Sequence, residues 1–315
     1  MVQALPPPEL CARPGGAAEE GVRGPVQFED PRLCVPCAVR KTKETTSSIR
    51  NRGPEPQGMR CPSAPAPCET GRMKVIAVIP ARLASTRLPR KMLREIAGVP
   101  LLARVYQAVG RSPSVEQVIV ATDSDEILQF CARQGFVARL TSVNHRSGTE
   151  RVHEISTAIP ADVYLNVQGD EPLTRPEHIE SLLEVMRGAG VEVGTLKTEA
   201  TEIDVGNPGA VKVVTDSAGR ALYFSRAAIP FDRDGIGAAY YKHLGFYGYR
   251  KDALDRFVHW PESLLERSER LEQLRFLENG ISIFVGETPF DTVGVDTEED
   301  AQRVEQILLR AGAER

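Results

Sequence analysis

One short loop carries four cationic side chains, Arg82, Arg87, Arg90 and Lys91, directly after the apolar run Val75–Ile79. Clustered cations repel one another unless an anion neutralises them, and a polyphosphate is a common partner for such a cluster. A solvated loop that forms surface salt bridges is the alternative, and this loop alone does not separate the two interpretations. The chain has neither a Walker A motif nor a GxGxxG fingerprint at this point.

A pair of carboxylates follows a second apolar run. Asp170 and Glu171 come after Val163–Val167, with Gly169 before them and Pro172 after them. Oxygen ligands of this kind suit a hard cation such as Mg²⁺, which also binds substrate phosphates. The alternative is that one of the two carboxylates caps a turn. Cations together with a metal carboxylate indicate the chemistry of a nucleoside triphosphate.

Three further polar stretches lie at the predicted ends of strands or starts of helices: Thr122–Ser124, the octet 144–151, and Asp296 before a helix with Thr297 as N-cap. For each of them, helix capping is the competing interpretation. Glycine in the octet 144–151 would allow backbone amides to face a ligand.

The apolar runs predict an α/β protein, because near-continuous apolar strands are typical of a parallel sheet that is covered on both faces. Pro80 is expected to end the first strand. Helices are expected from Pro100 to Gly110 and over Asp125–Gln134, and a long helix is expected to begin at Ser263. Because ligands bind beyond the carboxyl ends of parallel strands, the basic loop and the acidic pair should share one edge of the sheet.

Composition excludes several classes of partner. The chain has 315 residues, 39 basic and 43 acidic side chains and a formal net charge of -4, so no general attraction to nucleic acid or to a membrane surface is expected. No window has the apolar length of a membrane span, and no secretory signal is apparent. We therefore expect a cytoplasmic protein.

Residues 1–72 differ from the rest. They hold twelve of the 23 prolines, five of the six cysteines and a single aromatic residue, Phe28, so we expect disorder. Cys34 and Cys37 form a CxxC pair, but no second pair completes a zinc site. Residues 73–315 form the predicted catalytic domain, and Met73 is a candidate for the true start. Mass spectrometry of the native protein tests this start, and a mass that includes residues 1–72 contradicts it.

Several motifs occur together, in order, from Met73 onward. They are PARLASTRLPRK at 80–91, ATDSDE at 121–126, HRSGTER at 145–151, NVQGDEP at 166–172, NPGAVKVV at 207–214, ALYFSRAAIP at 221–230, KHLGFYGYR at 242–250, LEQLR at 271–275 and GVDTEED at 294–300. This set closely resembles the 3-deoxy-manno-octulosonate cytidylyltransferase family, the CMP-Kdo synthetases of lipopolysaccharide biosynthesis.

The resemblance implies a Rossmann-like nucleotidyltransferase fold with a mostly parallel mixed sheet and a smaller sugar-binding and dimerisation subregion. It implies CMP transfer from CTP to 3-deoxy-D-manno-octulosonate (Kdo), which yields CMP-Kdo and pyrophosphate with Mg²⁺ as cofactor, in a homodimer. A cytidylyltransferase for another acidic sugar, such as 8-amino-Kdo or a sialic acid, and a catalytically silent nucleotide-binding relative are the alternatives.

The resemblance also implies roles for individual residues. The catalytic residues would be Arg82, Lys91, Asp170 and Asp296, of which Asp170 and Asp296 would bind the metal. The CTP site would comprise Pro80, Ala81, Arg82, Ser85, Arg87, Lys91, Thr122, Asp123, Arg146 and Ser147. The Kdo site would comprise Gln168, Arg226, His243, Tyr249, Glu272 and Gln273.

One residue departs from the family pattern, because Arg90 stands where the family usually has glycine before the loop lysine. If that glycine serves a positive φ, Arg90 costs about 1 kcal/mol or more in strain. If it serves close approach of a phosphate, Arg90 either crowds the ligand or adds a contact to it.

Overall fold

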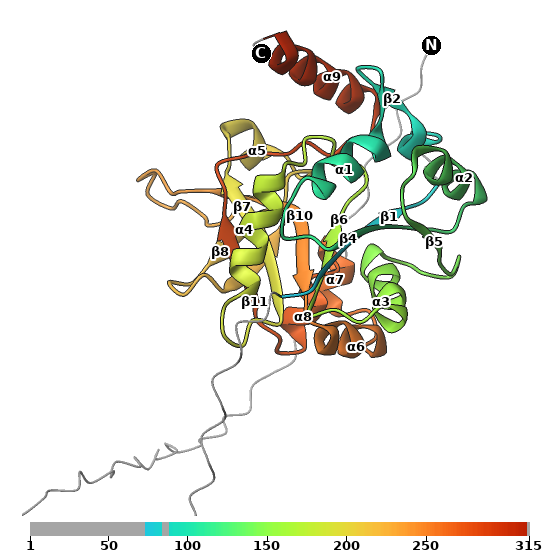
Figure 1. The fold of residues 1–315 in the computed structure, drawn as a ribbon. Coiled ribbons are helices and arrows are strands. Elements are labelled where there is room, and N and C mark those ends of the chain that lie inside the picture. Colours follow the sequence, from blue (N-terminus) through green and yellow to red (C-terminus); the bar gives the residue numbers. More distant parts are fainter. Residues whose placement is uncertain (1–72, 84–87, 314–315) are drawn as a thin grey trace, which may run out of the picture. The chain divides into compact units, whose positions relative to one another are not determined.

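Strand β1 (Val75–Ala81) lies between β6 and β4 inside a mixed sheet whose order is β11-β7-β10-β6-β1-β4-β5 (Figure 1). The computed structural model describes residues 73–83 and 88–313. Ser85, Arg87 and the whole segment 1–72, on which several predictions fall, lie outside the described residues.

The half of the sheet that contains β1 is parallel. β1 pairs in parallel with β4 (Gln117–Thr122) and β6 (Val163–Val167), and β4 pairs in parallel with β5 (Ala138–Leu140). The carboxyl ends of these strands therefore meet at one edge, as the sequence predicted.

The other half is mixed. β10 (Tyr241–Tyr249) lies antiparallel between β6 and β7 (Val193–Glu199), and β11 (Ile283–Glu287) pairs in parallel with β7. A hairpin of β8 (Lys212–Thr215) and β9 (Ala221–Ser225) joins the sheet through β10. The observed architecture confirms the predicted α/β class with a mixed sheet.

Helices cover both faces of the sheet (Figure 1). One face packs against α1 (Leu101–Gly110), α2 (Asp125–Gln134) and α4 (Pro176–Met186). The opposite face packs against α3 (Gly148–Ala158), α6 (Lys251–His259) and α8 (Leu274–Glu278). The remaining elements are η1 (Lys91–Leu93), β2 (Glu95–Ile96), β3 (Val99–Pro100), α5 (Glu202–Gly206), α7 (Leu264–Glu269) and α9 (Glu298–Ala313).

The side chains of β1 show why the sequence reads as one apolar run. Val75, Ala77 and Ile79 belong to the core on the α1 face, whereas Ile76 and Val78 belong to the core on the α3 face. Both faces are covered, so every position is apolar. Of the helices in the described ranges, none is long and apolar enough to cross a lipid bilayer.

The prediction that Pro80 ends the first strand is wrong. β1 continues through Pro80 to Ala81, which pair in parallel with Ala121 and Thr122. Pairing between β1 and β6 ends earlier, at Val78 and Asn166. Beyond Val78 the strand is thus paired on one side only, and a proline is tolerated there as it is in an edge strand.

The predicted long helix from Ser263 is also wrong, because two short helices occupy this segment. Arg270 takes the left-handed conformation with φ 55° and ends α7. A buried ion pair between Glu266 and Arg275 then holds α8 against α7. The buried Leu271 and Leu274 still face the core, which is why their spacing resembled one continuous helix.

Candidate active site

Residues from four segments converge on the predicted edge of the sheet. Arg82 follows β1, Asp123 follows β4 and Asp170 follows β6, and Lys91 opens η1 after the basic loop. Asp296 comes just before α9, outside that helix as predicted.

Lys91 lies between the two predicted metal ligands. Its Nζ donates to Asp170 Oδ2 at 2.6 Å and to Asp296 Oδ1 at 2.9 Å. The Lys91 side chain is 10% exposed, whereas the side chain of Asp296 is 46% exposed. Burial alone would lower the pKa of Lys91, but Asp170 and then Asp296 outweigh it and raise that pKa, so the ammonium is charged.

A backbone hydrogen bond and a helix cap hold Asp296 beside Asp170. The Val295 N–H donates to the Asp170 carbonyl at 2.9 Å, which fastens the two loops together. Thr297 caps α9, because its Oγ1 accepts from Asp300 N while Asp300 Oδ2 accepts from Thr297 N. This confirms Thr297 as the N-cap and leaves the Asp296 side chain directed to Lys91.

The two carboxylates fit a magnesium ion by their chemistry. Within the described part of the chain, no group of three or more His, Cys, Asp or Glu side chains could hold a metal. Asp170 and Asp296 offer oxygen donors only, and Mg²⁺ typically takes one or two protein carboxylates and completes its shell with water and substrate phosphates.

Glu171 does not point to the same place as Asp170. Its Oε2 is buried without a hydrogen-bond partner, and its Oε1 lies where a Cβ added at Gly294 would approach within 3.4 Å. Burial and then the neighbouring Asp170 raise the pKa of Glu171 to about 7. The two predicted carboxylates therefore have different surroundings, because Asp170 faces Lys91 whereas Glu171 is packed in the interior beside Gly294.

The predicted nucleotide side is organised around the start of α3. Ser147 is the N-cap of that helix and accepts from Glu150 N, so the capping interpretation of the octet holds for Ser147. Arg82 donates to the carbonyl of His145. Gly148 allows close packing, because a Cβ there would lie 3.3 Å from Pro80 Cγ. The predicted CTP residues Pro80, Arg82 and Ser147 are thus neighbours.

Asp123 is not the helix cap. Ser124 caps α2 by accepting from Ile127 N, and Asp123 instead pairs with Arg151. Thr122 Oγ1 accepts from Ser124 N and shapes the turn after β4. Arg146, by contrast, is 70% exposed in its side chain and pairs with Glu150.

Arg90 takes φ 55° and ψ 30°, the left-handed conformation. The structure thus favours a positive φ as the reason for glycine at this position. The Arg90 side chain pairs with Glu126 in the first turn of α2.

On the predicted sugar side, Tyr249 and Glu272 both contact Thr149 in the first turn of α3. Thr149 Oγ1 donates to Glu272 Oε1 at 2.7 Å and lies 3.3 Å from the Tyr249 hydroxyl. Tyr249 is 1% exposed and stacks between Tyr247 and Phe276. Burial raises the pKa of Glu272, whose Oε2 has no hydrogen-bond partner.

The other predicted sugar residues make hydrogen bonds to partners other than Thr149. His243 contacts Thr195 Oγ1 at 3.0 Å, and burial lowers the pKa of its ring to about 3, so the imidazole is neutral near pH 7. Gln168 Nε2 donates to Asn166 Oδ1. Arg226 donates to the carbonyls of Glu269, Pro208 and Arg270. Gln273 is buried at the start of α8.

A cavity of about 310 Å³ opens between the start of α3 and the α7–α8 segment. Its lining combines residues of both predicted sites with further charged side chains: Arg146, Ser147, Glu150, Glu262, Glu266, Arg270, Glu272 and Arg275.

Three residues near the site were not predicted. Asn166 is fully buried and holds Gln168, Thr149 joins Tyr249 to Glu272, and Arg151 pairs with Asp123. Two of them, Thr149 and Arg151, belong to the HRSGTER motif. A charged residue in a helix ordinarily indicates a solvated face, so only the motif itself could have drawn attention to Arg151.

Comparison with known proteins gives one consistent family. Residues 76–283 match the family model described as cytidylyltransferase. The 3-deoxy-manno-octulosonate cytidylyltransferase of Koribacter versatilis is 67% identical over 246 residues, which cover 78% of this chain and 94% of the relative. That of Acidobacterium capsulatum is 54% identical over 238 residues, covering 75% and 97%.

A solved structure agrees with these relatives. CMP:2-keto-3-deoxy-manno-octonic acid synthetase complexed with CTP matches with a TM-score of 0.73 and 40% identity, covering 76% of this chain and 99% of that one. With its fold, its clustered motif residues and these relatives, the chain belongs to the cytidylyltransferase family and, within it, to the 3-deoxy-manno-octulosonate cytidylyltransferases.

Proposed function

We propose that this protein transfers CMP from CTP to Kdo, releasing pyrophosphate and forming CMP-Kdo for lipopolysaccharide biosynthesis. The observation that carries the proposal is the contact of Lys91 Nζ with both Asp170 and Asp296 at the strand edge that also holds Arg82. A fixed cation and two carboxylates at that edge are the groups that nucleotidyl transfer requires.

The reaction forms a bond between the anomeric oxygen of Kdo and the α-phosphorus of CTP. It breaks the bond from that phosphorus to the oxygen of the β-phosphate, and the anomeric hydroxyl gives up its proton. Negative charge grows on the phosphate oxygens and on the leaving pyrophosphate. Lys91 and Arg82 are placed to stabilise that charge, because Lys91 is held rigidly and Arg82 is anchored to the His145 carbonyl. Mg²⁺ held by Asp170 and Asp296 would supply further neutralisation of the triphosphate.

CTP would lie against Pro80, Ala81, Thr122, Asp123, Arg146 and Ser147, with the triphosphate toward Arg82 and Lys91. Kdo would contact Gln168, Arg226, His243, Tyr249, Glu272 and Gln273. Because the imidazole of His243 is neutral near pH 7, it would serve as a hydrogen-bonding group, and the sugar carboxylate would need an arginine as its cationic partner.

The full chain, mixed with CTP and Mg²⁺, tests the reaction through pyrophosphate release with Kdo, 8-amino-Kdo and N-acetylneuraminate in parallel. We expect rapid release with Kdo alone. Release with another sugar only would change the substrate but keep the chemistry, whereas silence with all three sugars would indicate a non-catalytic relative.

Replacing one metal carboxylate tests the site. Asp170→Asn removes the charge but keeps the shape, and we expect kcat to fall by about 1,000-fold with the fold intact by circular dichroism. The control is Asp252→Asn on α6, an exposed carboxylate, which should retain full turnover. Retained activity of Asp170→Asn at ordinary magnesium concentrations would overturn the metal assignment.

The proposal includes a cytoplasmic homodimer. The loop between β9 and β10 carries Phe231 and Ile236, which are 85% and 86% exposed. Large apolar side chains with that exposure support an interface that a second copy would cover. A cytoplasmic location suits an enzyme whose nucleotide substrate is a cytoplasmic metabolite.

A further inference from the structure

Arg151 is a charged residue in the interior of the protein. It lies in the second turn of α3, is 0% exposed and is the largest of the fully buried side chains among the residues described. A guanidinium removed from water destabilises the fold unless hydrogen bonds compensate for the lost hydration. Its partners therefore show what the side chain does.

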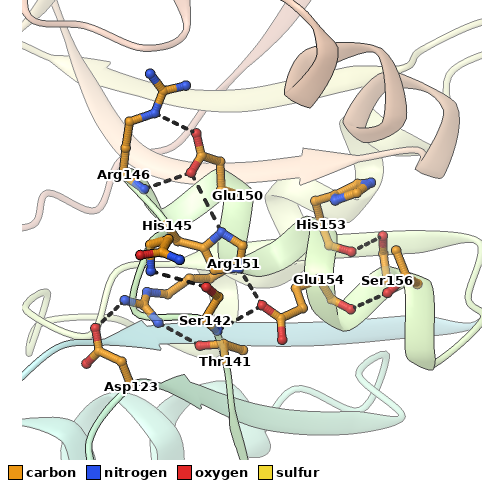
Figure 2. Close-up of polar contacts among 12 residues, drawn as sticks. Asp123, Thr141, Ser142, His145, Arg146, Glu150, Arg151, His153, Glu154 and Ser156 are labelled. Carbon is orange, nitrogen blue, oxygen red and sulfur yellow. Dashed lines mark hydrogen bonds and ion pairs between the residues drawn. The ribbon is translucent and has the colours of Figure 1, made fainter.

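Arg151 joins the turns that follow two neighbouring strands (Figure 2). Its Nη2 donates to Asp123 Oδ2, and its Nη1 donates to Thr141 Oγ1 at 2.6 Å. Thr141 in turn donates to the carbonyl of Thr122 through its backbone N–H at 2.7 Å and through its hydroxyl at 3.2 Å. The guanidinium thus restrains Asp123 directly, and it restrains Thr122 through Thr141.

The loop of residues 142–146 is held by hydrogen bonds and ion pairs to the same helix, α3 (Figure 2). Ser142 N–H donates to Glu154, the His145 ring contacts both Glu150 and Glu154, and Arg146 N–H donates to Glu150. Arg82 reaches this loop at the His145 carbonyl. Burial and the neighbouring Arg151 lower the pKa of Arg82.

One atom of Arg151 argues against a purely stabilising role. Its Nε is buried and has no hydrogen-bond partner. A buried donor without a partner costs folding free energy, and a side chain present only for stability would be expected to satisfy all its donors. Local costs of this kind are typical of functional sites.

We propose that Arg151 is a positioning residue of the nucleotide site, whose buried guanidinium fixes Thr122 and Asp123 in the geometry that receives cytidine. The inference rests on the proposed function, because that function assigns Thr122 and Asp123 to the CTP site. Groups held in place before the ligand arrives lose less freedom on binding, so the effect falls on nucleotide affinity.

Arg151→Lys tests the proposal in the full-length protein. A lysine retains the charge but cannot span Asp123 and Thr141 as a planar fork does. We expect KM for CTP to rise about 10-fold, with kcat and KM for Kdo within about twofold of the parent. Equal changes in both KM values, or no change in KM for CTP, would overturn the proposal.

Arg250→Lys is the matched control. Arg250 also joins two segments through its terminal nitrogens, since it donates to the carbonyls of Asp162 and Met186 at the opposite end of β6. We expect this variant to lower the melting temperature without changing KM for either substrate. If it raises KM for CTP as much as Arg151→Lys does, the effect is general loss of stability and the proposal fails.

A double-mutant cycle with Asp123→Asn tests the route of action. Because Arg151 acts partly through Asp123 and partly through Thr141, the rise in KM for CTP in the double variant should be smaller than the product of the two single effects, whereas fully multiplied effects would contradict the proposal. Should Arg151→Lys fail to fold, Thr141→Val is the alternative variant, because it removes only the hydroxyl that accepts from Arg151 Nη1. We expect Thr141→Val to raise KM for CTP about threefold, and an unchanged KM for CTP would contradict the proposal. Turnover of the parent protein with Kdo checks the proposed function separately.

Discussion

Arg90 is held in a conformation that an L-residue adopts only at a cost. Its φ of 55° corresponds to the left-handed region, which is unfavourable by about 1 kcal/mol for a residue with a Cβ. We predict that Arg90→Gly increases the free energy of unfolding by up to about 1 kcal/mol, because relief of strain exceeds the added freedom of the unfolded chain. Urea denaturation monitored by circular dichroism measures this difference.

Arg90→Ala is the control for that prediction. It loses the pair with Glu126 but retains the Cβ and hence the strain. The Arg90 side chain is 66% exposed, so the ion pair contributes little, at most about 1 kcal/mol. Arg90→Ala should therefore not stabilise the protein, and a gain equal to that of Arg90→Gly would show that strain is not the cause.

His243 makes stability depend on pH. Burial lowers the pKa of its imidazole to about 3, below the ordinary value of 6.5. Between these two values the unfolded chain binds a proton that the folded protein does not, so stability decreases as pH falls below about 6.5, by at most about 1.4 kcal/mol per pH unit. Above 6.5 this contribution is constant.

We predict that His243→Gln flattens this dependence. From pH 6.5 to pH 5 the parent should lose about 2 kcal/mol more stability than the variant, because glutamine has no proton to bind. Urea denaturation at both pH values tests the difference. The same loss in parent and variant would show that other groups account for the acid sensitivity.

At the scale of elements, α9 and the β2–β3 hairpin hold the two sides of the proposed metal site together. Glu305 of α9 accepts from Ala97 N–H in the hairpin at 2.7 Å, and Glu298 pairs with Arg94 just after η1. Ala301 and Val304 of α9 are buried with Leu88, Ile96 and Leu101. Lys91 precedes the hairpin and Asp296 precedes α9, so this packing sets their separation.

Loosening that packing should therefore raise the magnesium concentration that catalysis requires, in addition to lowering stability. Val304→Ala removes buried methyl groups and should cost about 2 kcal/mol of stability, together with a severalfold rise in the magnesium concentration needed for half-maximal activity. Val163→Ala, at the amino end of β6, is the matched control, since it is equally buried but far along its strand from Asp170. Equal magnesium requirements in the two variants would contradict this coupling.

At the scale of the whole molecule, the exposed apolar loop between β9 and β10 predicts the assembly state. Phe231→Asp together with Ile236→Asp should convert the expected homodimer into a monomer, because charged groups would have to be desolvated in the interface. Size-exclusion chromatography with light scattering measures the mass. Leu309→Asp on α9, at 59% exposure, is the control and should leave the mass unchanged. A monomeric parent protein would rule out the homodimer.

Much of this fold follows from local sequence. The predicted bounds of β6 and α2 agree with the structure, and the caps at Ser124 and Thr297 were among the expected signals. These features depend on a few neighbouring residues, whose spacing and capping groups determine them. The order of the motifs along the chain was also sufficient to indicate the family and its reaction.

Tertiary structure decided the rest, because the deciding contacts join residues far apart in the chain. Lys91 and Asp296 are 205 positions apart, and tertiary contacts, among them the packing of α9 and the hydrogen bond from Val295 N–H to the Asp170 carbonyl, bring them within hydrogen-bonding distance. The extension of β1 through Pro80 depends on where β6 separates from it, and the break at Arg270 accompanies a buried ion pair between α7 and α8. Arg151 is hydrophilic by type and buried only by its position, so its role became visible through Asp123 and Thr141 alone.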